Sequence, residues 1–171
     1  DTGYKLFKKF YYLSVEMDQM FPDVEKEFIE LKQKCLKFTM TSTESLYYTY
    51  RSVKHVIENN IPGDFIECGV WKGGNTMMAA LTLMNLKNTD RKIYLYDTFE
   101  GMSAPTEKDI SYKDEDAKIE WSQSQKDSHN EWCYSSIDEV KKNLYSTGYP
   151  EEKLVFVKGK VEDSIPATLP G

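Results

Sequence analysis

Two acidic residues and the glycines between them have the types and spacing that could hold a ligand. Residues 63–74 read Gly-Asp-Phe-Ile-Glu-Cys-Gly-Val-Trp-Lys-Gly-Gly, a short apolar run that ends at Glu67 and is followed by Gly69 and a Gly-Gly pair. This order predicts a strand, a glycine-rich turn and the start of a helix. In such a turn, backbone N–H groups can approach a small anionic or polar ligand.

A second apolar run, residues 93–96, ends at Asp97. A carboxylate at the end of the next strand can accept hydrogen bonds from both hydroxyls of a ribose. Together the two motifs predict a site for a nucleoside-containing cofactor on an α/β sheet. The alternative, a tight glycine turn without a ligand, is disfavoured by the acid behind the second strand.

The residues around Gly69 indicate which cofactor fits. A dinucleotide-binding turn has the pattern Gly-x-Gly-x-x-Gly, which makes room for a pyrophosphate. Here Trp71 stands two residues after Gly69, and Glu67 stands two residues before it. A pyrophosphate would meet an indole and a negative charge, whereas an ammonium group would be attracted to the acid. The pattern therefore favours S-adenosylmethionine, whose amino-acid end carries an ammonium group, over NAD.

Composition narrows the class of protein. The 171 residues fit one domain, and 40% hydrophobic and 29% charged residues are ordinary for a globular chain. A net charge of −6 disfavours nucleic acid or an anionic membrane as partner. Neither a spanning apolar run nor a signal pattern is visible. Cys35, Cys68 and Cys133 lack a Cys-x-x-Cys spacing, which predicts a reduced, cytoplasmic chain with Cys68 as a small core residue of a central strand.

The N-terminal part is expected to be helical. Residues 1–40 form an N-terminal helical segment in this interpretation, because apolar residues such as Val24, Phe28 and Leu31 recur at helical spacing. The segment could pack on the domain, or it could act as a lid or an oligomer contact. Thr41 and Glu44 have the spacing of a capping box, so the next helix is expected to open there.

The rest of the chain alternates between helices and strands. Helices are expected over residues 77–86 and from a capping box at Ser136 to Leu144, and a third strand over residues 154–158. This alternation predicts a parallel sheet with helices on both faces. Because only three strands are visible, residues 41–171 are expected to be the N-terminal half of a larger domain.

One long segment lacks a sustained apolar period. Residues 103–131 are expected to form a lid-like loop that is mobile without ligand and ordered over the site when ligand binds. Its acids lack the spacing of an octahedral metal site and are best explained as solvated charges: Asp109, Asp114, Glu115 and Asp116.

Four motifs in order closely resemble the macrocin O-methyltransferase family: residues 63–74, 90–102 (Asp-Arg-Lys-Ile-Tyr-Leu-Tyr-Asp-Thr-Phe-Glu-Gly-Met), 132–140 (Trp-Cys-Tyr-Ser-Ser-Ile-Asp-Glu-Val) and 161–166 (Val-Glu-Asp-Ser-Ile-Pro). Members of that family methylate sugar hydroxyls of macrolide and aminocoumarin antibiotics. The resemblance implies a Rossmann-like class I methyltransferase fold and S-adenosylmethionine as methyl donor. It also implies a magnesium ion that orients the acceptor hydroxyls.

The resemblance further implies which residues hold the cofactor. Glu67 and Gly69 would hold its methionine end, with Val70 and Trp71 lining the turn. The ribose would be bound by an acid with two flanking residues: Asp97, Thr98 and Phe99. The adenine side would include a carboxylate, two backbone groups and a hydroxyl that serves equally well as a helix cap: Asp163, Lys160, Val161 and Ser136.

The family's metal ligands and catalytic acid have no counterpart in this sequence. They lie in an Asp-Thr-Asp-Trp-like strand end and a later Asp-Asp pair, so the catalytic residues are expected beyond residue 171 and the chain alone is expected to be inactive. His129 could approach a sugar from the 103–131 segment and is a candidate of lower weight. Met40 and Thr41 resemble a segment that lies over the family's active site.

The resulting hypothesis is a metal-assisted O-methyltransferase that uses S-adenosylmethionine and acts on a sugar hydroxyl of a glycosylated small molecule. A cytoplasmic homo-oligomer without a nucleic-acid or membrane partner is expected, with Mg²⁺ in the full-length protein. The alternative is a methyltransferase-like binding protein without catalytic activity. The two differ in whether the longer reading frame contains the aspartate strand end and the Asp-Asp pair.

Overall fold

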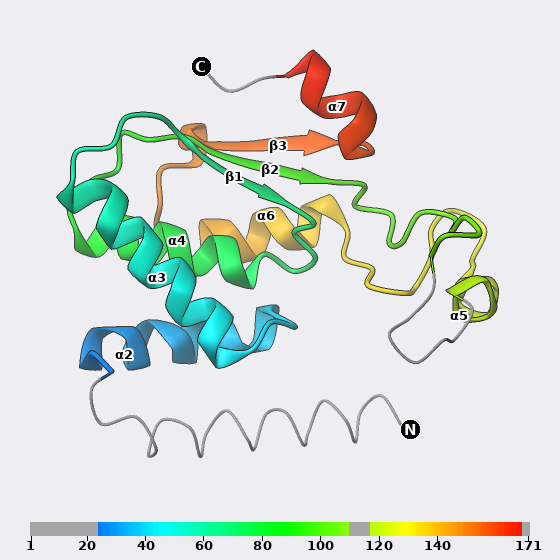
Figure 1. Ribbon diagram of the computed structural model, residues 1–171, viewed down its shortest axis with the longest axis horizontal. Coiled ribbons are helices and arrows are strands. Elements are labelled where there is room, and N and C mark those ends of the chain that lie inside the picture. The colour runs from blue at the N-terminus through cyan, green and yellow to red at the C-terminus, as the bar shows by residue number, and fades with distance from the viewer. Residues whose placement is uncertain (1–23, 110–116, 169–171) are drawn as a thin grey trace.

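Three parallel strands form one sheet at the centre of the molecule. The computed structural model describes residues 24–109 and 117–168. The strands lie side by side in chain order, and both pairs are parallel: β1 (Phe65–Cys68), β2 (Ile93–Asp97) and β3 (Leu154–Lys158). Their carboxyl ends therefore lie at the same edge of the sheet, as Figure 1 shows. The predicted parallel sheet is confirmed.

Helices cover both faces of this sheet. The connections between successive strands contain α4 (Gly74–Asn85) and α6 (Ile137–Tyr145), which lie on one face, while α7 (Val161–Ala167) lies on the other (Figure 1). A short 3₁₀ turn, η2 (Glu151–Lys153), leads into β3. Because α4 is apolar on most of its circumference, it can pack on the sheet and on neighbouring helices at once. The predicted α/β arrangement is thus confirmed.

The strand register sorts the side chains between the two faces. Glu67 pairs with Leu95, which pairs with Phe156, and the Phe156 ring contacts Tyr145 of α6 at 6.3 Å between centroids. This row therefore faces α4 and α6. The next row faces α7, because the Tyr96 hydroxyl donates to a carbonyl at the end of that helix. Strand β2 is buried on both faces because it is the central strand.

Strand β1 lies at the edge of the described sheet, and this corrects one expectation. The sequence predicted Cys68 as a small core residue of a central strand, but its side chain is exposed. Ile66, on the same face, is 53% exposed. Among the described residues no strand pairs with the outer edge of β1, and α7 covers β2 rather than β1. Within the part of the chain that the structure describes, neither a neighbouring strand nor a helix therefore buries the Cys68 side chain.

Two further helices form a layer beneath α4. Helix α2 (Lys26–Cys35) continues into a 3₁₀ turn, η1 (Leu36–Phe38), and packs against α4 and α3 (Thr43–Glu58). The predicted apolar stripe of α2 is buried, and the Phe28 ring contacts Tyr47 of α3 at 5.0 Å between centroids. The described part of the N-terminal segment is thus a packed helix, and residues 1–23 lie outside the described residues.

The helix caps were predicted correctly for α6 but not for α3. The Ser136 hydroxyl accepts from the Glu139 N–H at 3.2 Å and caps α6, as expected. In α3 the cap is Ser42, whose hydroxyl accepts from the Ser45 N–H, rather than Thr41. The Thr41 hydroxyl is paired with Thr39 instead. The predicted cap is therefore wrong by one residue, because the Thr41 hydroxyl is held by its neighbour Thr39 while the Ser42 hydroxyl is placed to accept from the first turn of the helix.

The 103–131 segment is more structured than its sequence predicted. It contains α5 (Ala117–Ser124), while residues 110–116, with three of the predicted solvated acids, lie outside the described residues. Its base is closed by two backbone hydrogen bonds, from Met102 N–H to Trp132 O and from Asn130 N–H to Glu100 O. No described residue of α5 is buried, so no apolar period was present in the sequence to reveal it. Mobility and ordering of the segment stay a prediction.

Among the described residues, no helix combines the length and the apolar character needed to cross a membrane.

Candidate functional site

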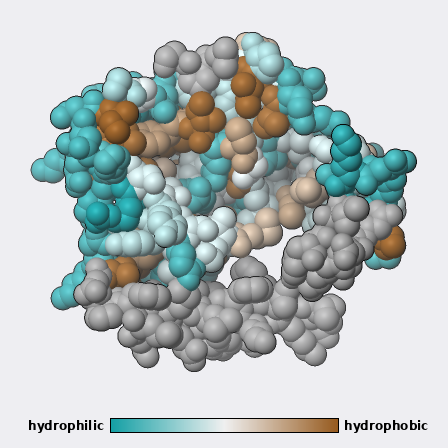
Figure 2. Space-filling model, in the orientation of Figure 1, coloured by the Kyte–Doolittle hydropathy of each residue, from teal (hydrophilic) through white to brown (hydrophobic). Residues whose placement is uncertain are grey.

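A cavity of about 730 Å³ opens at the carboxyl ends of the strands. Its walls come from the turns after all three strands and from both ends of the 103–131 segment. Figure 2 shows this face of the molecule hollowed between the strand ends and that segment. Ligands of open parallel sheets bind at this edge, because the turns that follow the strands project there together.

Asp97, at the end of β2, is hydrogen-bonded to the glycine turn that follows β1. Its Oδ2 accepts from the N–H groups of Val70 at 2.6 Å and Trp71 at 3.2 Å. Its Oδ1 accepts from the N–H of Phe99 at 2.8 Å. A half-buried carboxylate with three backbone donors is an effective clamp, because hydrogen bonds to a charged acceptor are stronger than neutral ones. Asp97 thus joins two strand ends at the wall of the cavity.

The glycine turn has a backbone that is suited to close approach of a ligand. Gly69 has φ +81°, and a Cβ placed there would meet no atom within 4 Å. Gly73 has φ +87°, but a Cβ there would lie 2.4 Å from Leu144 of α6. Trp71 between them has φ 50°, which is uncommon for a residue other than glycine. Gly73 is therefore needed to seat the turn on α6, while Gly69 leaves open space beside the cavity.

Glu67 lies apart from this cavity. Its carboxylate accepts from Asn75 Nδ2 at 3.1 Å and from the Thr76 hydroxyl, both in the first turn of α4. It lines a separate groove of about 280 Å³ together with these residues. Burial raises the pKa of Glu67 above its ordinary value. The side chain is already paired within the protein.

The eleven predicted cofactor residues fall into two groups. Six of the eleven line the cavity: Gly69, Trp71, Asp97, Thr98, Lys160 and Val161. The remaining five do not: Glu67, Val70, Phe99, Ser136 and Asp163. Val70 and Phe99 are buried behind the wall, Ser136 caps α6, and Asp163 is exposed on α7. Which of them touch a ligand stays a prediction.

His129, the catalytic candidate of the 103–131 segment, and Asp109, the described acid of the predicted charge run, both have local partners. His129 stacks on Tyr134 with 4.0 Å between ring centroids and does not line the cavity. Asp109 does line it, but accepts from the N–H and hydroxyl of Thr106, which lowers the pKa of Asp109. In residues 24–109 and 117–168 no group of three or more His, Cys, Asp or Glu residues could hold a metal ion.

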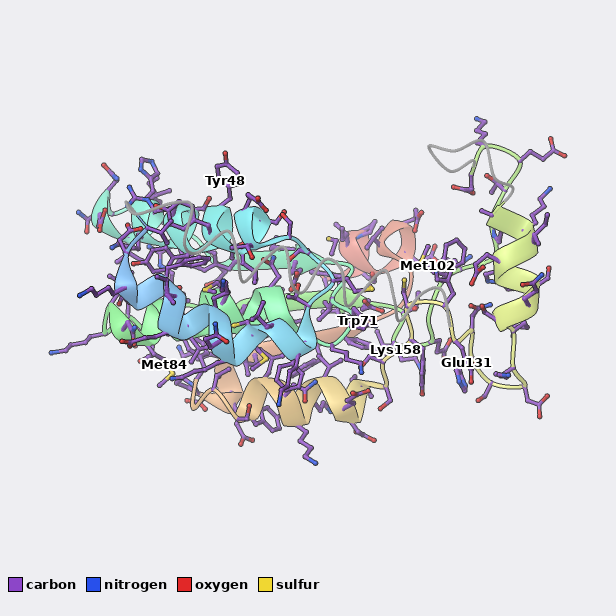
Figure 3. The ribbon with its side chains drawn as sticks, turned by 90° about the horizontal axis from the view of Figure 1, so that it is seen from below. Tyr48, Trp71, Met84, Met102, Glu131 and Lys158 are labelled. Carbon is purple, nitrogen blue, oxygen red and sulfur yellow. The ribbon has the colours of Figure 1, made fainter. Side chains whose placement is uncertain are left out.

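Several wall residues were not predicted as site residues, although they lie within the four motifs. They are mostly apolar or sulfur-containing: Cys68, Tyr96, Met102, Trp132 and Cys133. Figure 3 shows Trp71 and Met102 between the strand ends and α5. Met40, from the turn before α3, also lines the cavity and is 55% exposed. The motifs mark all of these positions except Met40, but which of their side chains reach the cavity depends on how the strands pair and how the 103–131 segment folds back.

Curated relatives of this chain are O-methyltransferases by name. One is the 8-demethyl-8-(2,3-dimethoxy-alpha-L-rhamnosyl)-tetracenomycin-C 4'-O-methyltransferase of Streptomyces olivaceus, 24% identical over 150 residues, which cover 88% of this chain and 54% of the relative. Another is the demethyldecarbamoylnovobiocin O-methyltransferase of Streptomyces niveus, 29% identical over 128 residues, which cover 75% and 46%. The chain thus spans about half the length of these relatives.

A solved structure shares the fold. The O-methyltransferase NovP matches with a TM-score of 0.64 and 27% sequence identity, covering 78% of this chain and 52% of NovP. The sequence model of the macrocin-O-methyltransferase (TylF) family matches residues 11–170, which is nearly the whole chain. The motifs around Glu67 and Asp97, the parallel sheet and these matches agree, and the chain belongs to the macrocin-O-methyltransferase family.

Proposed function

We propose that this chain binds S-adenosylmethionine in the cavity at the strand ends. We further propose that it is part of an O-methyltransferase for a sugar hydroxyl of a glycosylated small molecule. The observation that carries the proposal is the junction of Asp97 with the open glycine turn at the cavity wall. The name of the tetracenomycin relative, which contains a rhamnosyl group, supports the acceptor class.

The residues of the cavity fit this cofactor. The open space beside Gly69 admits the methionine end without a clash, as a close backbone approach requires. The carboxylate of Asp97 has about four acceptor positions, of which the backbone uses three. The Thr98 hydroxyl lies 3.4 Å from Oδ1, but it has one proton and donates it to the Gly101 carbonyl at 2.8 Å, so that a ribose hydroxyl can still donate to Asp97. When bound, S-adenosylmethionine supplies a methyl group on a sulfonium.

The wall of the cavity would keep water from the reacting atoms. Trp71, Met102 and Trp132 line it from three separate turns, and the last two flank the closed base of the 103–131 segment. Exclusion of water strengthens electrostatic interactions inside a site and prevents hydrolytic side reactions. We propose that these residues enclose the bound cofactor and one face of the acceptor.

Magnesium assistance does not fit the described residues. Among the described residues three acids line the cavity: Asp97 and Asp109, which already accept hydrogen bonds within the protein, and Glu162 of α7. Mg²⁺ prefers several oxygen ligands in near-octahedral geometry, which residues 24–109 and 117–168 do not offer. Metal assistance, cytoplasmic localisation and homo-oligomeric assembly stay predictions for the whole protein.

Calorimetry with S-adenosylhomocysteine tests cofactor binding. Gly69→Ala should weaken binding by roughly tenfold or more, because a methyl group would occupy the path of the ligand. Gly63→Ala is the matched control, since Gly63 has φ +110° and open space around its Cβ but lies at the opposite end of β1. Lack of binding by the unmodified chain, or equal affinities of the two variants, would refute the cofactor site.

An assay for transfer of a labelled methyl group distinguishes the two hypotheses, a methyltransferase and a binding protein without catalytic activity. S-adenosylmethionine with a labelled methyl group is offered with a set of glycosides, with and without Mg²⁺. Label recovered on a sugar hydroxyl supports the transferase. Tight cofactor binding without transfer to any glycoside favours a methyltransferase-like binding protein.

A further inference from the structure

Glu67 belongs to a hydrogen-bonded chain that links three elements. The Thr49 hydroxyl, in α3, donates to Asn75 Oδ1 at 2.6 Å. The Asn75 amide, in the first turn of α4, donates in turn to Glu67 Oε1 at 3.1 Å, and Thr76 donates to the second carboxylate oxygen. The side chains of Thr49, Asn75, Thr76 and Glu67 thus connect α3, α4 and β1.

The position of Glu67 in the sheet separates it from the cofactor cavity. Its row of the register faces α4 and α6, whereas Cys68, the next residue, faces the other side and lines the cavity. Glu67 itself lines the smaller groove, together with Thr49, Asn75 and Thr76. Successive side chains of a strand point to opposite faces, which places the Glu67 carboxylate on the α4 side of the sheet, where Asn75 and Thr76 bind it.

The same hydrogen bonds span the glycine turn. Glu67 lies on β1 before the turn, and Asn75 and Thr76 lie on α4 after it, so the bonds close the base of residues 68–74. A carboxylate near the first turn of a helix is also favoured by the helix dipole. Asp97 holds the tip of the same turn through Val70 and Trp71. The turn is therefore fixed at both its base and its tip.

We propose that Glu67 is a positioning residue that fixes the cofactor-binding turn by joining β1 to the first turn of α4, and that it does not contact the amino-acid end of the cofactor. The proposal rests on the proposed function, since it assumes that the cofactor binds at Gly69. It revises the role that the sequence assigned to Glu67. The ammonium group of the cofactor is then bound by other groups of the cavity.

Two ligands distinguish positioning from direct contact. S-adenosylhomocysteine carries the amino-acid end, and 5′-methylthioadenosine has the adenine, ribose and thioether without it. Glu67→Gln should weaken both ligands by a similar factor, about three- to tenfold, because a misplaced turn affects the whole site. A loss of affinity confined to S-adenosylhomocysteine would establish direct contact between Glu67 and the amino-acid end, and would overturn the proposal. Unchanged affinity for both ligands would also overturn it, because Glu67 would then not position the turn.

Asn75→Ala provides a second variant that leaves the carboxylate in place. Since Asn75 lines the groove and not the cavity, it should reproduce the equal loss for both ligands. Affinities are measured at a temperature where each variant is fully folded, so that a general loss of stability does not lower them. Should Glu67→Gln fail to fold, the Asn75→Ala result decides, and unchanged affinity in that variant would overturn the proposal.

Hydrogen exchange in the unliganded chain gives a readout that needs no cofactor. Amides of residues 69–77 should exchange faster in Glu67→Gln than in the unmodified chain, because the base of the turn is opened. Unchanged exchange over these residues would overturn the positioning role. If the unmodified chain binds neither ligand, the proposed function fails, and the exchange data still decide on Glu67.

Discussion

Replacing Asp97 by alanine should lower both the stability of the chain and its affinity for the cofactor. The carboxylate accepts three backbone N–H groups, from Val70, Trp71 and Phe99, at 2.6, 3.2 and 2.8 Å. At roughly 1 kcal/mol for each donor, and with water able to reach this half-buried site, Asp97→Ala should lower the free energy of unfolding by about 2–3 kcal/mol. This loss measures the clamp alone.

The affinity for S-adenosylhomocysteine reports the separate contact with the ribose. Loss of a charged acceptor for a ribose hydroxyl, together with a loosened turn, should cost about 1.5–3 kcal/mol of binding free energy. That is a factor of roughly 10 to 150 in the dissociation constant. Urea unfolding measures the stability, and calorimetry at a temperature where the variant is folded measures the affinity.

Asp64→Ala is the matched control for this variant. Asp64 Oδ1 accepts a single backbone N–H, from Lys92 at 2.9 Å, and lies just before β1, at the amino end of the sheet. This variant should lose about 1 kcal/mol of stability and no cofactor affinity. Unchanged affinity in Asp97→Ala would refute the ribose contact. Unchanged stability would refute the clamp between β2 and the glycine turn.

Three further predictions concern the segment over the site, the buried acid and the thiols. A Cβ at Gly101 would lie 1.8 Å from the carbonyl of Asn130, so Gly101→Ala should open the base of the 103–131 segment and speed its limited proteolysis; cleavage at the normal rate would contradict this. Burial raises the pKa of Glu67 above 4.5, so its contribution to stability is greatest below about pH 4.5 and is lost as the pH rises through the folded-state pKa. Glu67→Gln removes this titrating group, so the free energy of unfolding measured with urea should vary less with pH in that range than it does in the unmodified chain. An unchanged pH dependence would contradict the raised pKa of Glu67. Burial also raises the pKa of Cys35 to about 12, so an aromatic disulfide reagent should label the exposed Cys68 in the native chain and Cys35 only after unfolding.

The sequence by itself determined the three strands, the helices packed between and before them, and the edge of the sheet at which the site lies, but not α5 or α7. Apolar runs predicted all three strands, and the capping box at Ser136 located the start of α6, because these signals depend on neighbouring residues. The glycine turn and Asp97 could be placed together because the carboxyl ends of parallel strands share one edge. Gly69, Trp71 and Asp97 do line one cavity there.

Tertiary structure alone decided which way the side chains at that edge are directed. Glu67 and Cys68 are adjacent in the sequence, yet one is paired with α4 and the other is exposed at the cavity. Which face of a strand is covered depends on helices and strands that are distant along the chain. For the same reason, the approach of Met40 and Trp132 to the cavity had no local signal in residue spacing. Local patterns specify the elements, and long-range packing determines which of their side chains meet.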